Sequence, residues 1–181
     1  MTQIYGIDGG SLDVRAAEHL MAEVVTRLGT DTVLVGCTHL TTTGGPHVTL
    51  SIELDGVQDI GRFPLGLHLV RPGSGQGAAA QAAGAHHLRT SGRAVRFPGQ
   101  QHLTGVLPVG ELLAVSAIEA VVIVAGSGYP PDPATLIDTR NFVRPLWQDG
   151  RLTLHTMPAT NGMLAPFEVA NPTPCCADHG P

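Results

Sequence analysis

The sequence predicts one domain of the α/β or α+β class, built on a mixed β-sheet. A short apolar segment at residues 3–7, a segment with helical periodicity at residues 12–28 and a second apolar segment at residues 31–36 together indicate a β-α-β unit. Residues 48–54 then alternate strictly between apolar and polar side chains, and a hairpin signal lies at residues 148–150. We therefore expect antiparallel hairpins to continue a sheet that a β-α-β unit begins.

The helix expected over residues 12–28 has one apolar face. Its apolar side chains recur every three or four residues, at Ala17, Leu20, Met21, Val24 and Leu28. Ser11 is a suitable N-cap, and Gly29 suits the position just after the helix. The strand at residues 31–36 should run parallel to the first strand, after a right-handed crossover.

The alternating segment at residues 48–54 predicts a strand with one buried and one exposed face. The apolar residues expected to face the core are Val48, Leu50, Ile52 and Leu54, and those expected to face water are Thr49, Ser51 and Glu53. Asp55-Gly56 is a hairpin signal. A further strand is expected at residues 65–70, although Pro64 and Gly66 weaken its pattern.

Residues 72–92 are rich in glycine and alanine, which indicates either a glycine loop that opens a short alanine helix or a mobile insertion on the surface. A helical turn is expected at residues 111–115 and a buried strand at residues 120–125. Segments 142–147 and 152–156 flank the turn Gln148-Asp149-Gly150 and predict a hairpin.

From Met157 onward the chain contains five prolines and little periodicity, so it is expected to lie extended across the surface. We predict a single globular domain over residues 1–170. Residues 171–181 would form a tail that packs on or near this domain.

The composition excludes several classes of function. Charged residues make up 14% of the 181 residues, compared with about 25% in typical proteins, and the ten basic residues are all arginine. Without lysine, neither Schiff-base chemistry nor a Walker-type phosphate site is possible. The low charge has two compatible explanations, a compositional bias of the genome or a surface buried against a protein partner or further copies of the chain.

The charge and cysteine patterns bear on partners and location. The net charge is −5 and the arginines are scattered, so nucleic-acid binding is not expected. The N-terminus does not resemble a signal peptide, and the longest apolar run is too short to cross a membrane. Three cysteines do not make a disulfide framework, so a cytoplasmic protein with free thiols or a metal site is expected.

Cys37 and His39 form the first candidate site. Residues two apart on a strand project to the same side, so a thiol and an imidazole would meet at the carboxyl end of a strand, where open α/β sheets bind ligands. The alternative is that Cys37 is a small core residue and that His39 only begins a loop.

The tail carries the second candidate site, Cys175, Cys176 and His179. These residues are too few to hold zinc alone, but Cys37 and His39 would complete four ligands if the tail packs beside them. We therefore predict a small metal-binding protein, most plausibly a zinc protein. A free tail with idle thiols, or a disulfide to Cys37, are the alternatives.

Two other classes of function remain open. A cysteine-dependent enzyme would use the thiolate of Cys175 or Cys176 beside His179, which Asp178 or another carboxylate would orient, or the strand-end thiolate of Cys37. An assembly or interaction subunit without chemistry of its own would explain the low charge.

Glycines at positions 73, 75 and 77 form a weak candidate for cofactor binding. Gly73, Gly75 and Gly77 precede an alanine-rich segment, as in loops that bind phosphate at a helix N-terminus. Pro72 interrupts the pattern and no acidic residue follows at the distance where a ribose ligand is expected, so nucleotide binding is not expected. His86 and His87 could bind a metal together with His102, but adjacent histidines in a polar segment are expected to be solvated.

Residues 31–39, Asp-Thr-Val-Leu-Val-Gly-Cys-Thr-His, resemble the segment around one catalytic cysteine of the aspartate/glutamate racemase family. The resemblance covers about nine residues and carries over only Cys37 and Thr38. No earlier cysteine is present to supply the family's second catalytic thiol, and an alternating strand follows where the family has a helix. We therefore do not assign the chain to this family.

Overall fold

The computed structural model describes residues 2–56, 66–124 and 130–170, which form three α-helices and a mixed sheet. The helices are α1 (Val14–Leu28), α2 (Ala78–His87) and α3 (Val109–Val115), with 3-10 turns at Gln100–His102 and Thr160–Gly162. The first strands are β1 (Gln3–Ser11), β2 (Val33–Thr41), β3 (His47–Leu54), β4 (Leu69–Val70) and β5 (Arg93–Arg96). The others are β6 (Val106–Pro108), β7 (Ala120–Ile123), β8 (Leu136–Asp138), β9 (Leu146–Gln148), β10 (Arg151–Pro158) and β11 (Leu164–Pro166).

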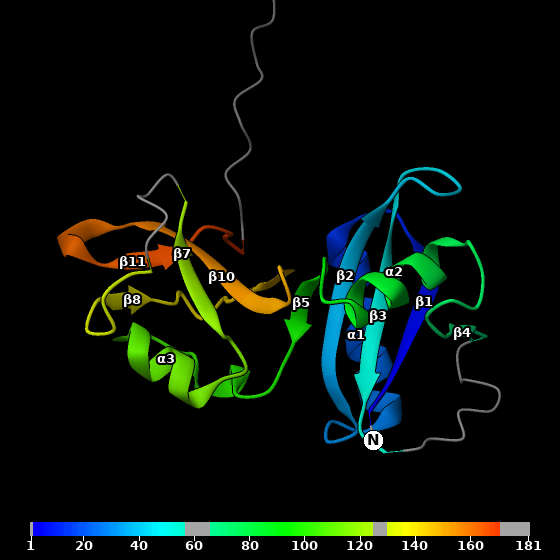
Figure 1. The fold of residues 1–181 in the computed structure, drawn as a ribbon, viewed down its shortest axis with the longest axis horizontal. Coiled ribbons are helices and arrows are strands. Elements are labelled where there is room, and N and C mark those ends of the chain that lie inside the picture. The colour runs from blue at the N-terminus through cyan, green and yellow to red at the C-terminus, as the bar shows by residue number, and fades with distance from the viewer. Residues whose placement is uncertain (1, 57–65, 125–129, 171–181) are drawn as a thin grey trace, which may run out of the picture.

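The sheet joins two lobes. Its strand order is β4-β1-β3-β2-β5-β9-β10-β11-β8-β6, and β7 pairs with β10. Figure 1 shows β1 to β4 with α1 and α2 at one end, and β6 to β11 with α3 at the other. β5 lies between the two lobes because it pairs with β2 on one side and with β9 on the other. The predicted mixed α and β composition is therefore present.

β3 lies at the centre of the first lobe, a position that the sequence did not predict. β1 and β2 are both antiparallel to β3, so they run in the same direction with β3 between them. Among the described residues, the prediction of a hairpin at Asp55-Gly56 is wrong, because the next described strand, β4, pairs with β1 and not with β3. The reason is that both edges of β3 are already occupied, and a strand has only two edges to pair.

α1 matches its predicted span closely and covers one face of this sheet. Asp13 rather than Ser11 is its N-cap, and its carboxylate accepts a hydrogen bond of 2.8 Å from the Ala16 amide. Gly29 ends the helix at φ 94°, a backbone conformation that glycine adopts without strain. The core between α1 and the sheet contains Ile7, Ala17, Met21, Val24, Leu50, Ile52 and Leu54.

The other face of β3 is not exposed to water, contrary to the prediction. Thr49 and Ser51 are fully buried and the Glu53 side chain is only 15% exposed. α2 packs over this face and begins at Ala78 after its N-cap Gly77, as the alternative with a short alanine helix predicted. Gly6 of β1 allows the close approach of α2, since a Cβ at this position would lie 1.8 Å from the carbonyl oxygen of Ala79.

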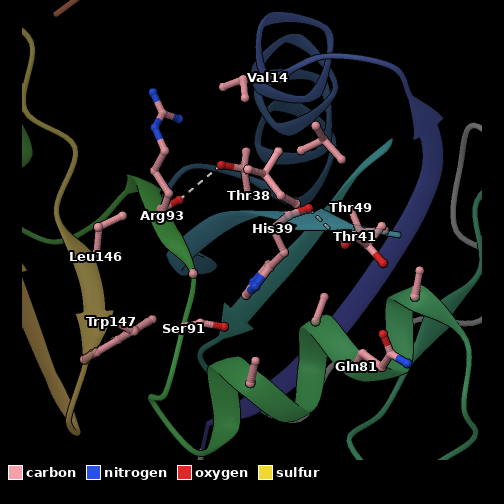
Figure 2. Close-up of a pocket in the computed structure, with 16 residues that line it drawn as sticks. Val14, Thr38, His39, Thr41, Thr49, Gln81, Ser91, Arg93, Leu146 and Trp147 are labelled. Carbon is pink, nitrogen blue, oxygen red and sulfur yellow. Dashed lines mark hydrogen bonds between the residues drawn. The ribbon is translucent and has the colours of Figure 1, made fainter. Parts of the chain in front are cut away.

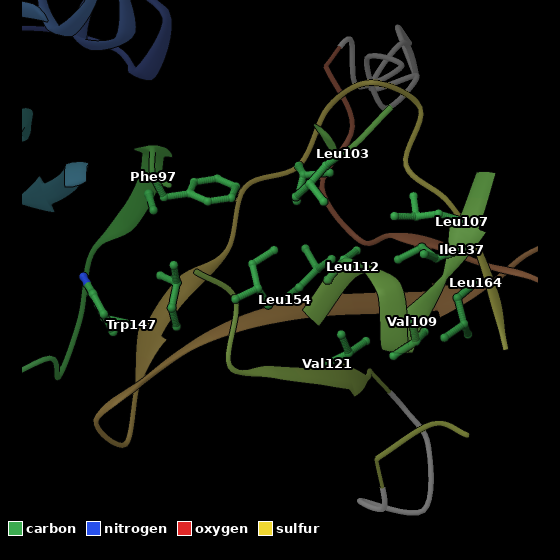
Figure 3. Close-up of a cluster of buried hydrophobic side chains, with 14 of the residues drawn as sticks. Phe97, Leu103, Leu107, Val109, Leu112, Val121, Ile137, Trp147, Leu154 and Leu164 are labelled. Atoms are coloured by element: carbon green, nitrogen blue, oxygen red, sulfur yellow. The ribbon is translucent and has the colours of Figure 1, made fainter. Parts of the chain in front are cut away.

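The second lobe has its own hydrophobic core, part of which Figure 3 shows. The predicted hairpin is confirmed as β9 and β10, with Asp149 at φ 50° and Gly150 at φ 80° in its two-residue turn. Residues expected to form a helical turn and a strand form α3 and β7. Trp147 projects into this core from β9. In the described ranges, no helix combines the length and the hydropathy needed to cross a bilayer.

The chain after Met157 was predicted to lie extended across the surface rather than to form a packed element, and up to residue 170 this is wrong. β10 continues to Pro158 and pairs with β11, where Leu164 and Ala165 are buried. The prolines at the ends of these strands do not prevent the pairing, because a strand tolerates proline at its ends. The predicted tail at residues 171–181 lies outside the described residues.

Candidate functional site

A chain of four polar side chains crosses the buried layer between α2 and the sheet. His39 Nε2 lies 2.7 Å from Ser51 Oγ, and Ser51 Oγ lies 2.8 Å from His86 Nδ1. The opposite nitrogen of this second ring, His86 Nε2, lies 3.7 Å from Glu53 Oε2. The last distance is too long for a direct hydrogen bond, so the contact between ring and carboxylate is electrostatic. The side chains of His39, Ser51, His86 and Glu53 thus form a continuous polar chain.

Strand register explains how three of these side chains come together. His39 is opposite Thr49 and Cys37 is opposite Ser51 in the antiparallel pair of β2 and β3. Alternate residues of a strand project to the same face, so His39 joins Ser51 and Glu53 under α2. His86 comes from the last turn of α2, which brings its ring down onto the polar side of β3.

The environment makes His39 a neutral imidazole at neutral pH. Burial and the neighbouring His86 ring lower the pKa of His39 to about 4. The His86 ring lowers the pKa of the Glu53 carboxyl, although burial acts in the opposite direction. The neutral imidazole of His39 can accept a proton at one end of this polar chain, and the Glu53 carboxylate lies at the other end. The side chains between them can pass a proton on.

The Cys37 thiol lies beside this chain but is not poised as a nucleophile. The residue is fully buried, and burial raises the pKa of its thiol to about 12, against smaller opposing effects of Ser51 and Trp147. A thiol with this pKa is protonated at neutral pH, and the thiolate is the reactive form. The environment of Cys37 thus favours the interpretation as a small core residue.

A cavity of about 550 Å³ opens beside His39. Figure 2 shows His39 pointing toward the space between α2 and the segment that carries Ser91. Polar lining groups come from Thr38, His39, Thr41, Thr49, Gln81, Ser91 and Arg93, and apolar ones from Val14, Leu40, Val48, Ala78, Ala82, Ala85, Leu146 and Trp147. An apolar wall with a few polar groups is typical of sites for small molecules.

Arg93 is the one charged side chain among the described lining residues other than the titratable His39, and its charge is compensated. Its guanidinium lies 2.7 Å from Glu18 of α1 and makes a bidentate contact with Glu168. Arg144 shares Glu18 at 3.1 Å. Burial would raise the pKa of the Glu18 carboxyl, but hydrogen bonds from Arg144 and Arg93 lower it. The two arginines and two carboxylates cancel, so the cavity has little net charge.

The absence of a side chain at Gly92 leaves space for the His39 ring. A Cβ at this position would lie 2.7 Å from His39 Cε1 and 3.2 Å from Cys37 Cβ, and the residue has φ 132°. Neither the space nor the backbone conformation suits another residue. The Ser91–Gly92 segment therefore holds the imidazole against Ser51 without blocking the cavity.

The structure brings together only part of the predicted metal site. Cys37 and His39 lie on one face of β2, and His39 is inside the strand rather than at the start of a loop. Cys175, Cys176 and His179 lie outside the described residues. Among the residues that are described, no group of three or more His, Cys, Asp or Glu side chains is arranged to hold a metal ion.

The other candidate residues have different outcomes. Gly73 and Gly75 lie in the loop before α2 with positive φ, and Gly77 is the N-cap of the helix. His86 was expected to be solvated, and this is wrong, because its side chain is 1% exposed between α2 and the sheet. The available signal was the run of alanines before it, since a helix of small residues can pack close enough to a sheet to bury its last histidine.

Scans of the chain against protein-family models, curated proteins and solved structures each found no match. The evidence for function is therefore the geometry of the site itself.

Proposed function

We propose that this protein binds a small molecule in the cavity beside His39 and uses His39 as a general base on it. The observation that carries the proposal is the buried polar chain that begins at the cavity wall and ends at Glu53. Polar groups are costly to bury, so a continuous chain of them at a cavity points to a use in binding or proton transfer.

The chemistry available is acid–base chemistry rather than nucleophilic attack. Ser51 and Cys37 are both fully buried, so neither can reach a substrate in the cavity. His39 lines the cavity and is neutral at neutral pH, which a general base requires. The apolar wall, including Trp147, supports a ligand with an apolar body.

A fragment screen followed by protein NMR tests this proposal. Bound fragments should shift the amide signals of Gly92 and Leu146, which border the cavity. Ala85→Phe fills the cavity from α2 and should abolish these shifts. His87→Phe, which adds the same side chain at an exposed position of the same helix, should leave them unchanged. Fragments that bind equally well to the Ala85→Phe protein would refute the site.

We also propose zinc binding as a second candidate function. Its structural support is that Cys37 and His39 project from one face of β2, both against Gly92. Two ligands are too few for a structural zinc ion, so Cys175 or Cys176 and His179 would have to supply the others.

Metal analysis of the full chain, purified without added metal, tests the zinc proposal. About one ion per chain is expected, and removal of residues from Cys175 onward should abolish it. A shorter truncation that removes only Gly180 and Pro181 is the matched control and should keep the metal. A metal-free full chain would end this proposal and leave the proposal for His39 intact.

A further inference from the structure

The Ser51 hydroxyl has one proton and two ring nitrogens as neighbours. It lies 2.7 Å from His39 Nε2 and 2.8 Å from His86 Nδ1, both hydrogen-bond distances. A hydroxyl donates one hydrogen bond and accepts others, so Ser51 can donate to only one of the two rings and accepts from the other. The two hydrogen bonds at Ser51 therefore run in the same donor-to-acceptor direction along the polar chain. A group that does not contact Ser51 must determine which of the two directions is adopted.

Glu53 is the carboxylate that lies near enough to His86 to influence this direction. When both rings are neutral, a carboxylate 3.7 Å from His86 Nε2 favours the tautomer with its proton on that nitrogen. The lone pair of His86 is then at Nδ1, so Ser51 donates to it. Ser51 in turn accepts from His39 Nε2, and this leaves the lone pair of His39 at Nδ1.

We propose that Glu53 orients this chain so that His39 Nδ1 is the proton acceptor of the cavity, and that the ligand is an uncharged molecule with an apolar body and an O–H or N–H donor. This inference rests on the function proposed above. An uncharged ligand fits because Arg93, the charged lining residue, is already paired with Glu18 and Glu168. The donor fits because His39 lines the cavity, where a bound ligand can donate a hydrogen bond to the lone pair of Nδ1.

The same orientation provides a path for the proton. When His39 Nδ1 takes a proton from the ligand, the Nε2 proton of His39 passes to Ser51 Oγ and the Ser51 proton passes to His86 Nδ1. The ligand becomes an anion and His86 becomes a cation beside the Glu53 carboxylate. The positive charge thus leaves the buried His39 for a position with a counter-ion, where it is more stable.

Glu53 acts in this scheme as a positioning residue, because it lies at the far end of the chain and does not line the cavity. Its removal should change the tautomers of His39 and His86 without changing the shape of the cavity. Glu53→Gln is the variant to use because it removes the charge and retains the size. Glu23→Gln, on the exposed side of α1, is the matched control.

The first test is ¹⁵N NMR of the histidine rings in the full chain at pH about 8, where histidine is ordinarily neutral. We expect His39 to be protonated at Nε2 and unprotonated at Nδ1. In the Glu53→Gln protein we expect both tautomers of His39, and in the Glu23→Gln protein the same result as in the original chain. Protonation of His39 at Nδ1 in the original chain would overturn the inference.

The second test compares phenol with anisole, which has a methyl group in place of the hydroxyl proton. Binding can be followed by the fluorescence of Trp147, the one tryptophan of the chain, at wavelengths that only tryptophan absorbs. One hydrogen bond to His39 predicts that phenol binds roughly five- to tenfold more tightly. The preference should fall to about twofold or less in the Glu53→Gln protein.

The outcomes separate the inference from the function on which it rests. Equal affinity for phenol and anisole in the original chain would overturn the donor requirement and leave the cavity as a binding site. Binding of neither compound would overturn the ligand class together with the proposed function. The tautomer of His39 is measured without any ligand, so it tests the role of Glu53 in either case.

Discussion

Acidification should destabilise this protein through His39. The pKa of His39 falls from its ordinary value of 6.5 to about 4 in the folded chain, mainly because of burial and secondly because of His86. The unfolded chain therefore binds a proton at His39 below pH 6.5, and the folded chain does so only near pH 4. The stabilising contribution is complete above pH 6.5 and is lost as the pH falls from 6.5 toward 4.

The size of the effect follows from the two pKa values. At pH 5 the unfolded form of His39 is almost fully protonated and the folded form is almost fully neutral. Linkage then predicts that the free energy of unfolding is lower at pH 5 than at pH 7 by about 2 kcal/mol from this residue alone. Such a loss is a large fraction of the stability of an ordinary domain.

Urea denaturation at pH 7 and pH 5 can measure this loss. Glu18 and Glu53 also have lowered pKa values and will contribute at acid pH, so the comparison needs a variant that lacks only the imidazole. Between pH 7 and pH 5, the original chain should lose about 2 kcal/mol more than the His39→Gln protein. An equal loss in the two proteins would show that His39 is not buried as a neutral ring.

Three substitutions and one control substitution test the packing around α2. Ser51→Ala leaves a ring nitrogen on each histidine without its partner, so the free energy of unfolding should fall by about 2–4 kcal/mol, whereas Ser74→Ala in the exposed loop before α2 should change it little. Gly84→Ala should raise it by up to about 1 kcal/mol, because a Cβ there meets no atom within 4 Å and alanine favours a helix. Gly6→Ala should lower it by about 3 kcal/mol, because its Cβ would lie 1.8 Å from the Ala79 carbonyl oxygen. Denaturation curves check all of these, and a tolerated Gly6→Ala would show that α2 does not lie against β1.

The elements predicted well from the sequence are those whose signals are local. The three- and four-residue spacing of apolar side chains located α1, and Gly29 marked its end. The strict alternation located β3, and Asp149-Gly150 located the hairpin of β9 and β10, because each of these patterns depends on residues close together in the chain. Cys37 and His39 were correctly placed on one face for the same reason.

The candidate site itself could not be predicted, because its parts are distant in sequence. The alternation of β3 shows that Thr49, Ser51 and Glu53 share a face, but the same pattern fits a strand exposed to water. Whether that face is buried depends on α2, which the sequence presented only as one of two alternatives for residues 72–92. Ser51 and His86 are 35 residues apart, and no local pattern pairs them.

The sequence by itself determined which residues of each strand and helix face the same way, because backbone geometry sets the periods of 2 and 3.6 residues. Only the tertiary structure decided what those faces meet. The close packing of the alanine helix α2 on Gly6 turned a predicted exposed face into a buried one and brought His86 to Ser51. Burial then lowered the pKa of His39 and joined four ordinary polar residues into one candidate site.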